Sequence, residues 1–278
     1  MKKSRAKIEF YKMSGSGNDF IIIDNRDLSL DDGDLPAFTR RLCARKVSVG
    51  ADGLLLIEPS SRADFKWRFF NSDGSVAEMC GNAARCVARL AHLKGIAGRN
   101  LSFETLAGII KAEIKNDVPK VKLTDPSAMT LGEKIITDGR EFVVDILNTG
   151  VPHAVTFVDD LASFEVVHWG RKIRFHEKFQ PKGSNVNFSL VLGRHKLKVR
   201  TYERGVENET LACGTGDVAA VLAAAQRNLV DSPVDVVVQS GETLRVYFRR
   251  EDNRFAEIYL EGRVKIVYQG FLFDEAYK

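Results

Sequence analysis

The sequence predicts an α+β fold of two similar, pseudo-symmetric domains, each a strand-rich roll or barrel that encloses one central helix. Three observations predict this fold. Short apolar or alternating runs recur along the whole 278 residues, two strong helical patterns each follow a Cys-Gly pair, and several landmarks repeat at one offset. A chain of this length has room for one large domain or for two of about 140 residues, and the repeat favours two.

Strands are the commonest predicted element. They are indicated by runs that alternate or are apolar throughout, and that are bounded by turn residues. These runs are 20–24, 54–58, 66–70, 101–106, 109–114, 120–123, 141–147, 154–158, 186–191, 196–202, 234–239, 243–248, 256–260 and 264–273.

Helices are fewer than strands. One is predicted to begin near Asp34, because Pro36 falls in its first turn and Phe38 and Leu42 share a face. A second, short helix is expected within 161–175.

The two strongest helical patterns begin immediately after Cys80 and Cys213. Downstream of Cys80, apolar residues recur at helical spacing until Gly95 offers a stop. The segment 217–226, after Cys213, is apolar nearly all the way round, as is typical of a helix buried on every side. A central helix surrounded by strands is therefore expected in each half.

The two halves repeat. Landmarks separated by one fixed offset indicate an internal duplication, because chance matches do not share an offset. The landmarks are the pairs Gly17 and Gly150, Cys80 and Cys213, Gly81 and Gly214, and Gly108 and Gly241, each 133 residues apart (213 − 80 = 133).

The duplication predicts where the domains divide. A cluster of breaker residues around Pro126 marks the linker, so we expect an N-terminal domain over 1–124 and a C-terminal domain over 125–265. The last segment, 266–278, is expected to return to the N-terminal domain as a strand. In this arrangement the two cysteines that precede the central helices would face each other across the cleft between the domains.

Composition limits the function classes. The net charge is only +4 and the basic residues are scattered, so no nucleic-acid partner is expected. No apolar run approaches the roughly 20 residues of a membrane span, and no apolar signal core follows the basic N-terminus. We therefore expect a cytoplasmic protein with no membrane partner.

The four cysteines are too few and too widely spread to form a disulfide framework, so thiols are expected. Their spacing does not suit zinc either. Cys43 and Cys86 are predicted to be small core residues. Cys80 and Cys213 differ from them because each stands at the start of a predicted helix.

A cysteine at a helix start is exposed to the positive end of the helix dipole, which lowers its pKa and suits it to acid/base chemistry. The backbone N–H groups that follow form nests for an anion. These N–H groups belong to Gly81, Asn82, Gly214 and Thr215. A carboxylate held there would place its α-carbon between two sulfurs, one able to remove a proton and the other to donate one to the opposite face. That is the geometry of an epimerase or racemase.

Two alternatives remain open from the residues alone. Facing cysteines could form a redox pair, although such pairs usually occur as Cys-x-x-Cys. The helix ends could also bind an amino acid or anion without catalysis. Nothing in the sequence marks a bound cofactor or metal, and none is expected.

At these residues the sequence resembles the diaminopimelate epimerases, over essentially its whole length. Seven segments carry the resemblance: 13–20, 70–75, 80–86, 150–153, 186–187, 202–205 and 212–216. The resemblance implies a cofactor-independent isomerase that interconverts LL- and meso-2,6-diaminoheptanedioate in lysine and peptidoglycan precursor biosynthesis. It also implies a homodimer, with Tyr268 as a possible contact.

The resemblance further implies that Cys80 and Cys213 are the two acid/base residues, one thiolate and one thiol, and that His153 and Glu203 tune them. A nearby imidazolium would favour the thiolate and a nearby carboxylate the thiol. The substrate's distal carboxylate suits an Arg fork, and its distal ammonium suits Asn carbonyls and a Glu. The implied substrate-binding residues are Asn18, Asn71, Gly81, Asn82, Asn187, Glu203, Arg204, Gly214 and Thr215.

Structural roles remain open for some of these residues: Asn71 could be a turn residue, His153 a satisfied imidazole and Glu203-Arg204 a surface pair. The chain also departs from the family pattern. Many members have Asn where Val151 stands and Gln where Gly53 stands, so two contacts to substrate could differ. Proline racemase and hydroxyproline epimerase also use paired cysteines. They usually carry His in place of Asn82, which disfavours them.

Overall fold

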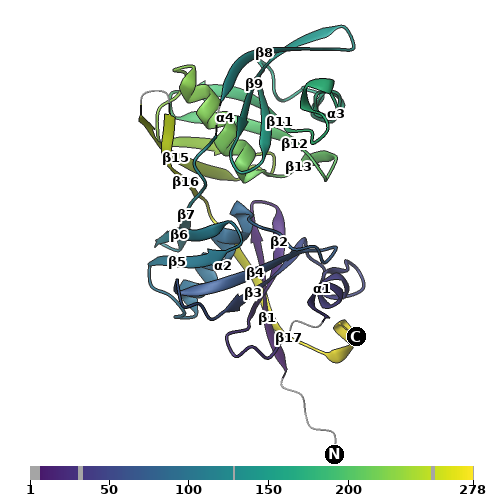
Figure 1. Ribbon diagram of the computed structural model, residues 1–278, viewed down its shortest axis with the longest axis vertical. Helices are drawn as coiled ribbons and strands as arrows, with labels where there is room; N and C mark the ends of the chain where they lie inside the picture. The colour runs from purple at the N-terminus through teal and green to yellow at the C-terminus, as the bar shows by residue number, and fades with distance from the viewer. Residues whose placement is uncertain (1–6, 31–33, 128, 252–253, 278) are drawn as a thin grey trace, which may run out of the picture. The chain divides into compact units, whose positions relative to one another are not determined.

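The structure is a computed structural model that describes residues 7–30, 34–127, 129–251 and 254–277. The chain forms two compact units, one of Met1–Val121 with Arg263–Lys278 and one of Lys122–Gly262 (Figure 1). The boundary expected after residue 124 lies close to this division, and the C-terminal strand belongs to the first unit.

The first unit is a single roll of strands. Its order is β17-β1-β2-β3-β4-β5-β6-β7, in which β2–β3 and β4–β5 are parallel and the other pairs antiparallel. Its elements are β1 (Ile8–Gly15), β2 (Asn18–Asp24), α1 (Leu35–Cys43), β3 (Gly53–Glu58), β4 (Phe65–Asn71), α2 (Gly81–Leu93), β5 (Asn100–Thr105), β6 (Gly108–Lys115), β7 (Val118–Lys122), β17 (Lys265–Leu272) and the 3-10 turn η3 (Asp274–Ala276).

The second unit has the order β8-β9-β10-β11-β12-β14-β15-β16, with β10–β11 and β12–β14 parallel and the short β13 beside β12. Its elements are β8 (Thr130–Thr137), β9 (Arg140–Asn148), β10 (Pro152–Phe157), α3 (Val166–Arg174), η2 (Glu177–Phe179), β11 (Asn185–Gly193), β12 (Lys196–Glu203), β13 (Asn208–Thr210), α4 (Gly214–Gln226), β14 (Val234–Val237), β15 (Thr243–Glu251) and β16 (Arg254–Glu261).

The two units therefore share one topology, and the α+β prediction with one central helix in each is confirmed. The same two pairings are parallel in both, and β17 lies beside β1 as β8 lies beside β9. The central helices α2 and α4 each have 13 residues and begin one residue after a cysteine. The predicted helices near Asp34 and within 161–175 are α1 and α3.

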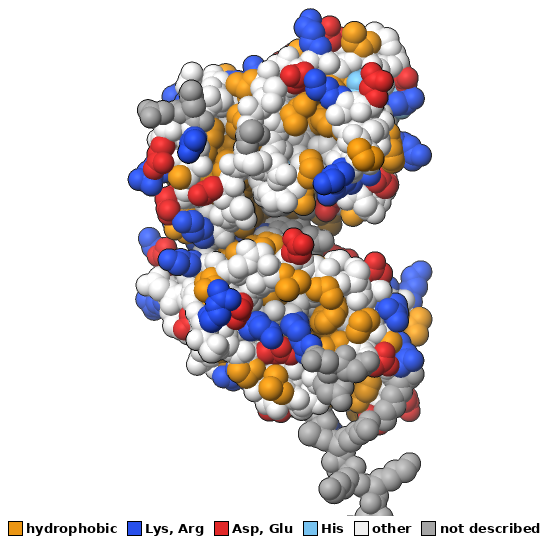
Figure 2. Space-filling view, viewed as in Figure 1, with side chains coloured by type: hydrophobic (Ala, Val, Ile, Leu, Met, Phe, Trp, Pro, Cys, Tyr) orange, Lys and Arg blue, Asp and Glu red, His pale blue; other side chains and the backbone are white. Residues whose placement is uncertain are grey.

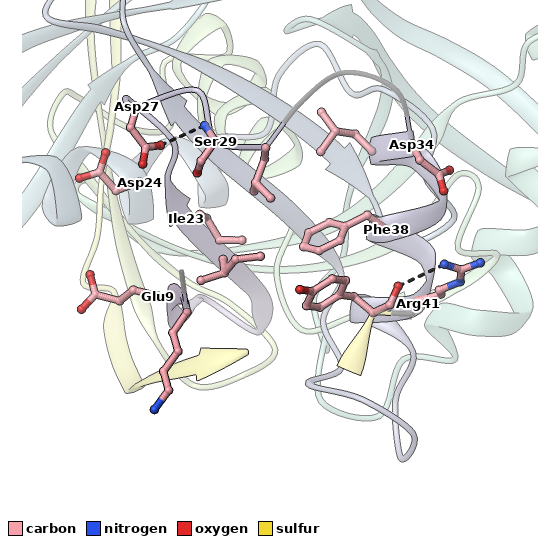
Figure 3. A pocket seen from close by; sticks show the side chains of 13 residues that line it. Glu9, Ile23, Asp24, Asp27, Ser29, Asp34, Phe38 and Arg41 are labelled. Carbon is pink, nitrogen blue, oxygen red and sulfur yellow. Dashed lines mark hydrogen bonds between the residues drawn. The ribbon is translucent and has the colours of Figure 1, made fainter. Parts of the chain in front are cut away.

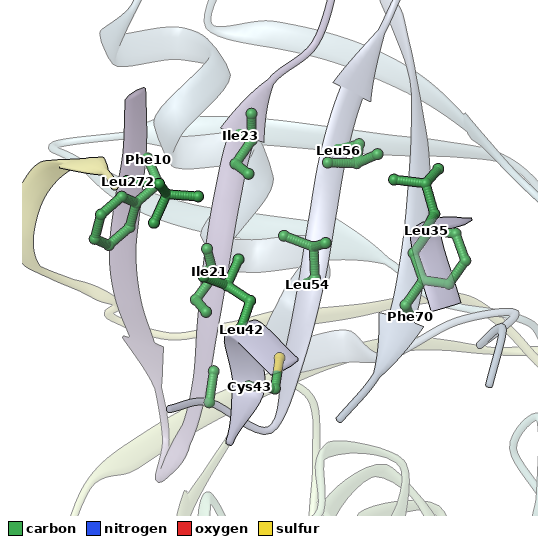
Figure 4. Packing of buried hydrophobic residues seen from close by; sticks show 11 residues of the cluster. Phe10, Ile21, Ile23, Leu35, Leu42, Cys43, Leu54, Leu56, Phe70 and Leu272 are labelled. Carbon is green, nitrogen blue, oxygen red and sulfur yellow. The ribbon is translucent and has the colours of Figure 1, made fainter. Parts of the chain in front are cut away.

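In the first unit the sheet is buried on both faces, which explains its unbroken apolar runs. Side chains alternate along a strand. Ile21 and Leu54 pack with α1 residues such as Leu42 in one core cluster (Figure 4). The intervening Ile22 and Leu55 are also fully buried, and α2 packs against β1, β2, β3 and β6.

The second unit repeats this layering. Val186 and Phe188 of β11 pack with the α3 residues Val166 and Ile173. The alternate positions of β10 and β11 turn toward α4, which packs on β9, β10, β11 and β12 and also on β14, β15 and β16. Nearly every residue of α4 is buried, as its all-round apolar pattern predicts.

Three strands were missed by the sequence patterns: β1, β8 and the three-residue β13. In β1 the alternation is broken by Lys12, which is buried and whose ammonium donates to Gly50 O and pairs with Asp19 at 2.7 Å. In β8 only Ile135 is buried, so the strand shows no apolar periodicity. All three strands form because a neighbouring strand offers backbone partners.

On the face shown in Figure 2, Lys and Arg side chains are interspersed with Asp and Glu on both units. Among the described residues, no helix is long and apolar enough to cross a membrane.

Candidate active site

Cys80 lies at the N-cap of α2. Its backbone is extended, with φ −147° and ψ 122°, and its carbonyl accepts the first intrahelical bond, from Ala84 N at 2.9 Å. The N–H groups of Gly81 and Asn82 therefore precede the helical ladder, as in any helix start. Cys80 is partly exposed, whereas Gly81 and Asn82 are buried. The sulfur of Cys80 and these N–H groups together form a half-site.

A chain of side-chain hydrogen bonds lies beside this helix start. Asn82 Nδ2 donates to Asn18 Oδ1 at 2.7 Å, and Asn18 Nδ2 donates to Asp52 Oδ2 at 3.0 Å. The oxygen of Asn82 accepts from Arg85 Nη2, and Ser16 Oγ lies 3.1 Å from the same nitrogen. The structure thus brings Asn18 and Asn82 together, and adds Ser16, Asp52 and Arg85, which the sequence analysis did not select.

An ion cluster anchors the far end of this chain. Arg45 bonds to both Asp19 and Asp52, and Lys12 pairs with Asp19. Burial alone would raise the pKa of Asp19, but the contacts with Arg45 and Lys12 outweigh burial and hold that pKa below its usual value. The turn between β1 and β2 is thereby fixed against the start of β3.

Asn71 is exposed at the end of β4 and forms a turn. Its Nδ2 donates to Ser75 Oγ at 3.0 Å and its backbone N–H donates to Ser75 O at 2.8 Å. Gly74 N–H in turn donates to Asn71 O at 2.9 Å. The turn leads the chain from β4 toward Cys80, so Asn71 has the structural role that the sequence left open.

Cys213 lies at the N-cap of α4, with φ −128° and ψ 99°, and is buried. Burial raises the pKa of its thiol well above the usual value, and the carboxylates of Glu203 and Asp217 raise it further. Hydrogen bonds from Thr215 and from the Gly216 N–H act in the opposite direction but are outweighed. The expected lowering of this pKa by the helix start is therefore wrong for Cys213, because desolvation of the thiolate dominates.

His153 connects the first turn of α4 to the sheet. Its Nε2 lies 3.1 Å from Thr215 Oγ1, and its Nδ1 lies 3.1 Å from Asn187 Nδ2. Because an amide nitrogen can only donate, Nδ1 accepts and Nε2 carries the proton. Thr215 Oγ1 also lies 3.6 Å from Cys213 Sγ, so His153 reaches the sulfur through one hydroxyl.

The imidazole of His153 is neutral, which corrects the expectation of an imidazolium. The side chain is fully buried, and burial together with the positive charge of Arg204 lowers its pKa to about 3. A charged ring would lose its hydration and face a like charge. His153 therefore acts through a hydrogen bond rather than through a formal charge.

Asn187 is fully enclosed beneath α4. Its Oδ1 accepts from Thr201 Oγ1 at 3.0 Å, and its Nδ2 also donates to Ala154 O at 3.2 Å. Its place is explained by strand alternation, since His153, Asn187 and Thr201 lie on the side of the sheet that α4 covers. Within the second unit, Asn187 supports His153 and the helix.

Asn185, two residues earlier on the same face of β11, was missed by the sequence analysis. Its Oδ1 accepts the Arg204 N–H at 2.8 Å, and its Nδ2 lies 3.3 Å from Pro152 O. Asn185 thus joins the ends of β10 and β12 on the His153 side. The sequence did hold a signal: Asn185 and Asn187 are two residues apart, and a strand that includes both places them on the same face.

Close packing explains why position 53 is a glycine. A Cβ at this position would lie 2.7 Å from both the Phe69 ring and the Phe70 carbonyl oxygen. The ring of Phe69, packed at 5.9 Å from Phe20, fills the space that a longer side chain at 53 would need. The departure at Gly53 is therefore matched by an aromatic neighbour, and a Gln would not fit there.

The other two cysteines are core residues. Cys43 is buried in the α1 cluster, where desolvation raises its pKa to about 12, and Cys86 is buried in α2. Among the described residues, no group of three His, Cys, Asp or Glu side chains is arranged to hold a metal ion.

A cavity of about 870 Å³ lies elsewhere in the first unit. Its lining includes Glu9, Asp24 and Asp27 on one side and Phe38 and Arg41 on the other (Figure 3). Glu9 and Asp24 come from the end of the β1–β2 hairpin remote from its turn, and Phe38 and Arg41 come from α1, whereas Asn18 stands at the turn. The cavity therefore does not include the candidate site residues.

Solved structures share this fold over nearly the whole chain. A PhzF-family phenazine biosynthesis protein from Bacillus anthracis matches with a TM-score of 0.75 at 15% identity, covering 96% of this chain and 99% of that one. A hydroxyproline epimerase from Agrobacterium vitis matches with a TM-score of 0.70 at 19% identity, covering 99% and 95%. This chain is thus a two-unit α+β protein in which a cysteine caps the central helix of each unit.

The family of this chain is shown by a family model and by relatives of higher sequence identity. The family model described as "Diaminopimelate epimerase" matches residues 10–129 and 146–267. The diaminopimelate epimerase of Aquifex aeolicus is 49% identical over 280 residues, covering 96% of this chain and 99% of that protein. That of Archaeoglobus fulgidus is 43% identical over 279 residues, covering 96% of each. This chain belongs to the diaminopimelate epimerase family.

Gly216→Ala should destabilise the second unit, although alanine favours helices by about 1 kcal/mol. The added Cβ would lie 2.2 Å from Asn187 Oδ1, which is held by buried partners, so we expect a net loss of about 1–3 kcal/mol. Thermal unfolding measures this loss. Gly193→Ala is the matched control, because a Cβ there meets nothing within 4 Å. An unchanged or higher Tm for Gly216→Ala would contradict the packing described.

Acid should destabilise the protein partly through His153. Because its pKa falls from 6.5 to about 3 on folding, the unfolded chain binds the proton first. The contribution of His153 is therefore complete above pH 6.5 and is lost as the pH falls toward 3, by about 1.4 kcal/mol per pH unit.

Denaturant unfolding between pH 7 and pH 4 measures this slope. His153→Gln should flatten it, whereas the same change at the exposed His195 should not. Equal slopes of unfolding free energy against pH in wild type and His153→Gln would mean that His153 is not buried in its neutral form.

Proposed function

We propose that this chain interconverts LL- and meso-2,6-diaminoheptanedioate, without a cofactor, by two-base chemistry. One cysteine removes the α-proton, and the other donates a proton to the opposite face of the same carbon. The observation that carries the proposal is the duplication itself, in which a cysteine caps the central helix of each unit. The family supports the same reaction, and we propose that it serves lysine and peptidoglycan precursor synthesis.

The helix starts supply the electrostatic part of the reaction. An α-proton next to a carboxylate is only weakly acidic, so the charge that develops on the carboxylate must be stabilised by fixed donors. The N–H groups of Gly81 and Asn82 in one unit, and of Gly214 and Thr215 in the other, are proposed as these donors. Each pair precedes its helical ladder and points along the helix dipole.

The charges around Cys213 support its role as the resting acid. Glu203 and Asp217 both oppose ionisation of its buried sulfur, so we assign the thiol to Cys213 and the thiolate to Cys80. Reprotonation leaves the opposite pair of states, which the reverse reaction uses.

A hydrogen-bonded chain tunes Cys213 once it ionises. Because His153 Nε2 donates to Thr215 Oγ1, the Thr215 hydroxyl proton is available for Cys213 Sγ, 3.6 Å away. A donor at that sulfur stabilises the thiolate when it forms. His153 thus serves as a neutral relay, and Glu203 sets the resting state.

Further residues of this site are proposed to bind the substrate. Arg204 and Glu203 are proposed to bind the distal carboxylate and ammonium of the substrate. The backbone of Arg204 is held by Asn185, which keeps the Glu203-Arg204 pair in place. Asn71 and Asn187 are proposed to read the substrate from the two units. Asn187 already bonds within its own unit, so its contribution would be limited.

We propose a cytoplasmic homodimer that uses β17. The side chains of Val267, Tyr268 and Phe271 on this edge strand are exposed. The ring of Tyr268 packs edge-on against Phe10, with the ring centroids 5.8 Å apart. A second copy that covers this strand would bury apolar area that a lone chain exposes.

Exchange of the α-hydrogen tests the function. With reduced protein in D2O, proton NMR of LL-2,6-diaminoheptanedioate should show loss of the α-proton signal and formation of the meso isomer. Cys80→Ala and Cys213→Ala should each lower the rate of epimerisation by at least about 1,000-fold, because a two-base reaction needs both sulfurs.

Cys43→Ala is the matched control, since Cys43 is a buried core thiol, and it should keep the rate. Full activity in either active-site variant would refute the two-base assignment. Stabilisation by the ligand without any exchange would instead favour an amino-acid-binding protein.

Glu203→Gln should make Cys213 more reactive. Removing the carboxylate lowers the Cys213 pKa, because one of the charges that raises it is lost. At pH 8, in a Cys80→Ala background, iodoacetamide should therefore alkylate Cys213 about 3- to 10-fold faster. Glu209→Gln, a change on a carboxylate that pairs with Arg200 instead, should leave that rate unchanged. Slower alkylation of the Glu203→Gln protein would overturn the assignment of Cys213 as the resting thiol.

A further inference from the structure

Arg85 is a buried charge one turn below Cys80. Its side chain is fully enclosed, and four neutral oxygens lie within hydrogen-bonding distance of it. Nη2 contacts Asn82 Oδ1 and Ser16 Oγ, Nε lies 3.4 Å from Gly81 O and Nη1 lies 3.5 Å from Arg263 O. Two of these acceptors belong to the first turn of α2, where the reacting carboxylate is proposed to bind.

The contacts fix which way each carboxamide faces. A guanidinium can only donate, so the Asn82 atom next to Arg85 is its oxygen, and Nδ2 must then be the group that donates to Asn18 Oδ1. At the other end the carboxylate of Asp52 can only accept, so the Asn18 atom next to it is Nδ2. Arg85 and Asp52 therefore set the same orientation from opposite ends.

This orientation decides what a ligand meets. Each carboxamide oxygen already accepts a hydrogen bond, from Arg85 or from Asn82. Each NH2 group donates one N–H to the named partner, to Asn18 or to Asp52, so its second N–H is the group that remains to be offered. Asn18 and Asn82 thus each have an N–H to offer, which suits a carboxylate, whereas Asn carbonyls were expected to bind an ammonium.

The second unit has an apolar residue at the corresponding position. At the repeat offset of 133 residues, Arg85 corresponds to Val218 (85 + 133 = 218), and both side chains are fully buried in their helices. The helix fold therefore does not need an arginine here, because the same helix packs with valine in the other copy. The guanidinium of Arg85 serves something specific to the Cys80 half-site.

We propose that Arg85 is a positioning residue that locks the carboxamides of Asn82 and Asn18 so that both offer N–H donors to the substrate carboxylate held at the start of α2. This inference rests on the proposed function for the identity of the ligand. The orientation of the amides does not depend on it.

The first test is kinetic. Arg85→Met keeps the length and apolar bulk of the side chain but removes the donors, and should raise the KM for LL-2,6-diaminoheptanedioate about 10- to 100-fold. The kcat should fall as well, because donors at the reacting carboxylate also stabilise the charge that develops on it in the transition state. Arg89→Met is the matched control: Arg89 lies one turn further along α2 and donates to Val264 O at 2.6 Å, without contact to Asn82.

A double-mutant cycle separates positioning from a merely structural role. If Arg85 acts through Asn82, Arg85→Met should add little to the KM of an Asn82→Ala protein, in which there is no carboxamide to orient. The same rise in KM in both backgrounds would overturn the proposal.

The second test does not need turnover. In protein labelled with 15N-asparagine, the side-chain NH2 signals of Asn18 and Asn82, assigned from Asn18→Ala and Asn82→Ala, should shift and exchange faster in Arg85→Met and stay in place in Arg89→Met. Signals that do not move in Arg85→Met would refute the inference even if the enzyme is active. If the signals shift in Arg85→Met but the wild-type protein is inactive, the proposed function is refuted and the positioning role of Arg85 is not.

Discussion

The rest of this structure depends on the burial of a helix start. Each unit wraps a roll of strands around one helix, so the first turn of that helix is largely buried; Cys213 is buried with it, and Cys80 is partly exposed. In water the N–H groups of the first turn would be hydrated and the helix dipole would be screened. Inside a roll they become fixed donors, and the cysteine sulfur becomes sensitive to every nearby charge.

Burial alone would make both cysteines poor bases, since desolvation opposes the thiolate. The two units differ in this respect, because the same kind of helix start is surrounded by different polar groups in each. Behind Cys80 stand an arginine and two asparagines, linked by hydrogen bonds to Asp52. Behind Cys213 stand the carboxylates of Glu203 and Asp217.

The repeat therefore conserves backbone geometry and varies electrostatics. Strand order, parallel pairings and the length of the central helix are common to both units. The residues one turn into each helix are not, since arginine in one copy is replaced by valine in the other. A symmetric fold can in this way hold an acid and a base, which a reaction at one carbon requires from opposite sides.

By itself the sequence determined the fold class, the duplication and the two cysteine-capped helices, because periodicity, glycine offsets and helix starts are local patterns. It missed β1, β8 and β13, whose backbone pairing comes from neighbouring strands, and it missed Arg85 and Asn185. Only the tertiary structure decided that His153 is neutral and that the Cys213 thiol resists ionisation. Both outcomes follow from desolvation and from charges contributed by separate elements, and a residue's exposure to water is set by the packed chain, not by its immediate neighbours in sequence.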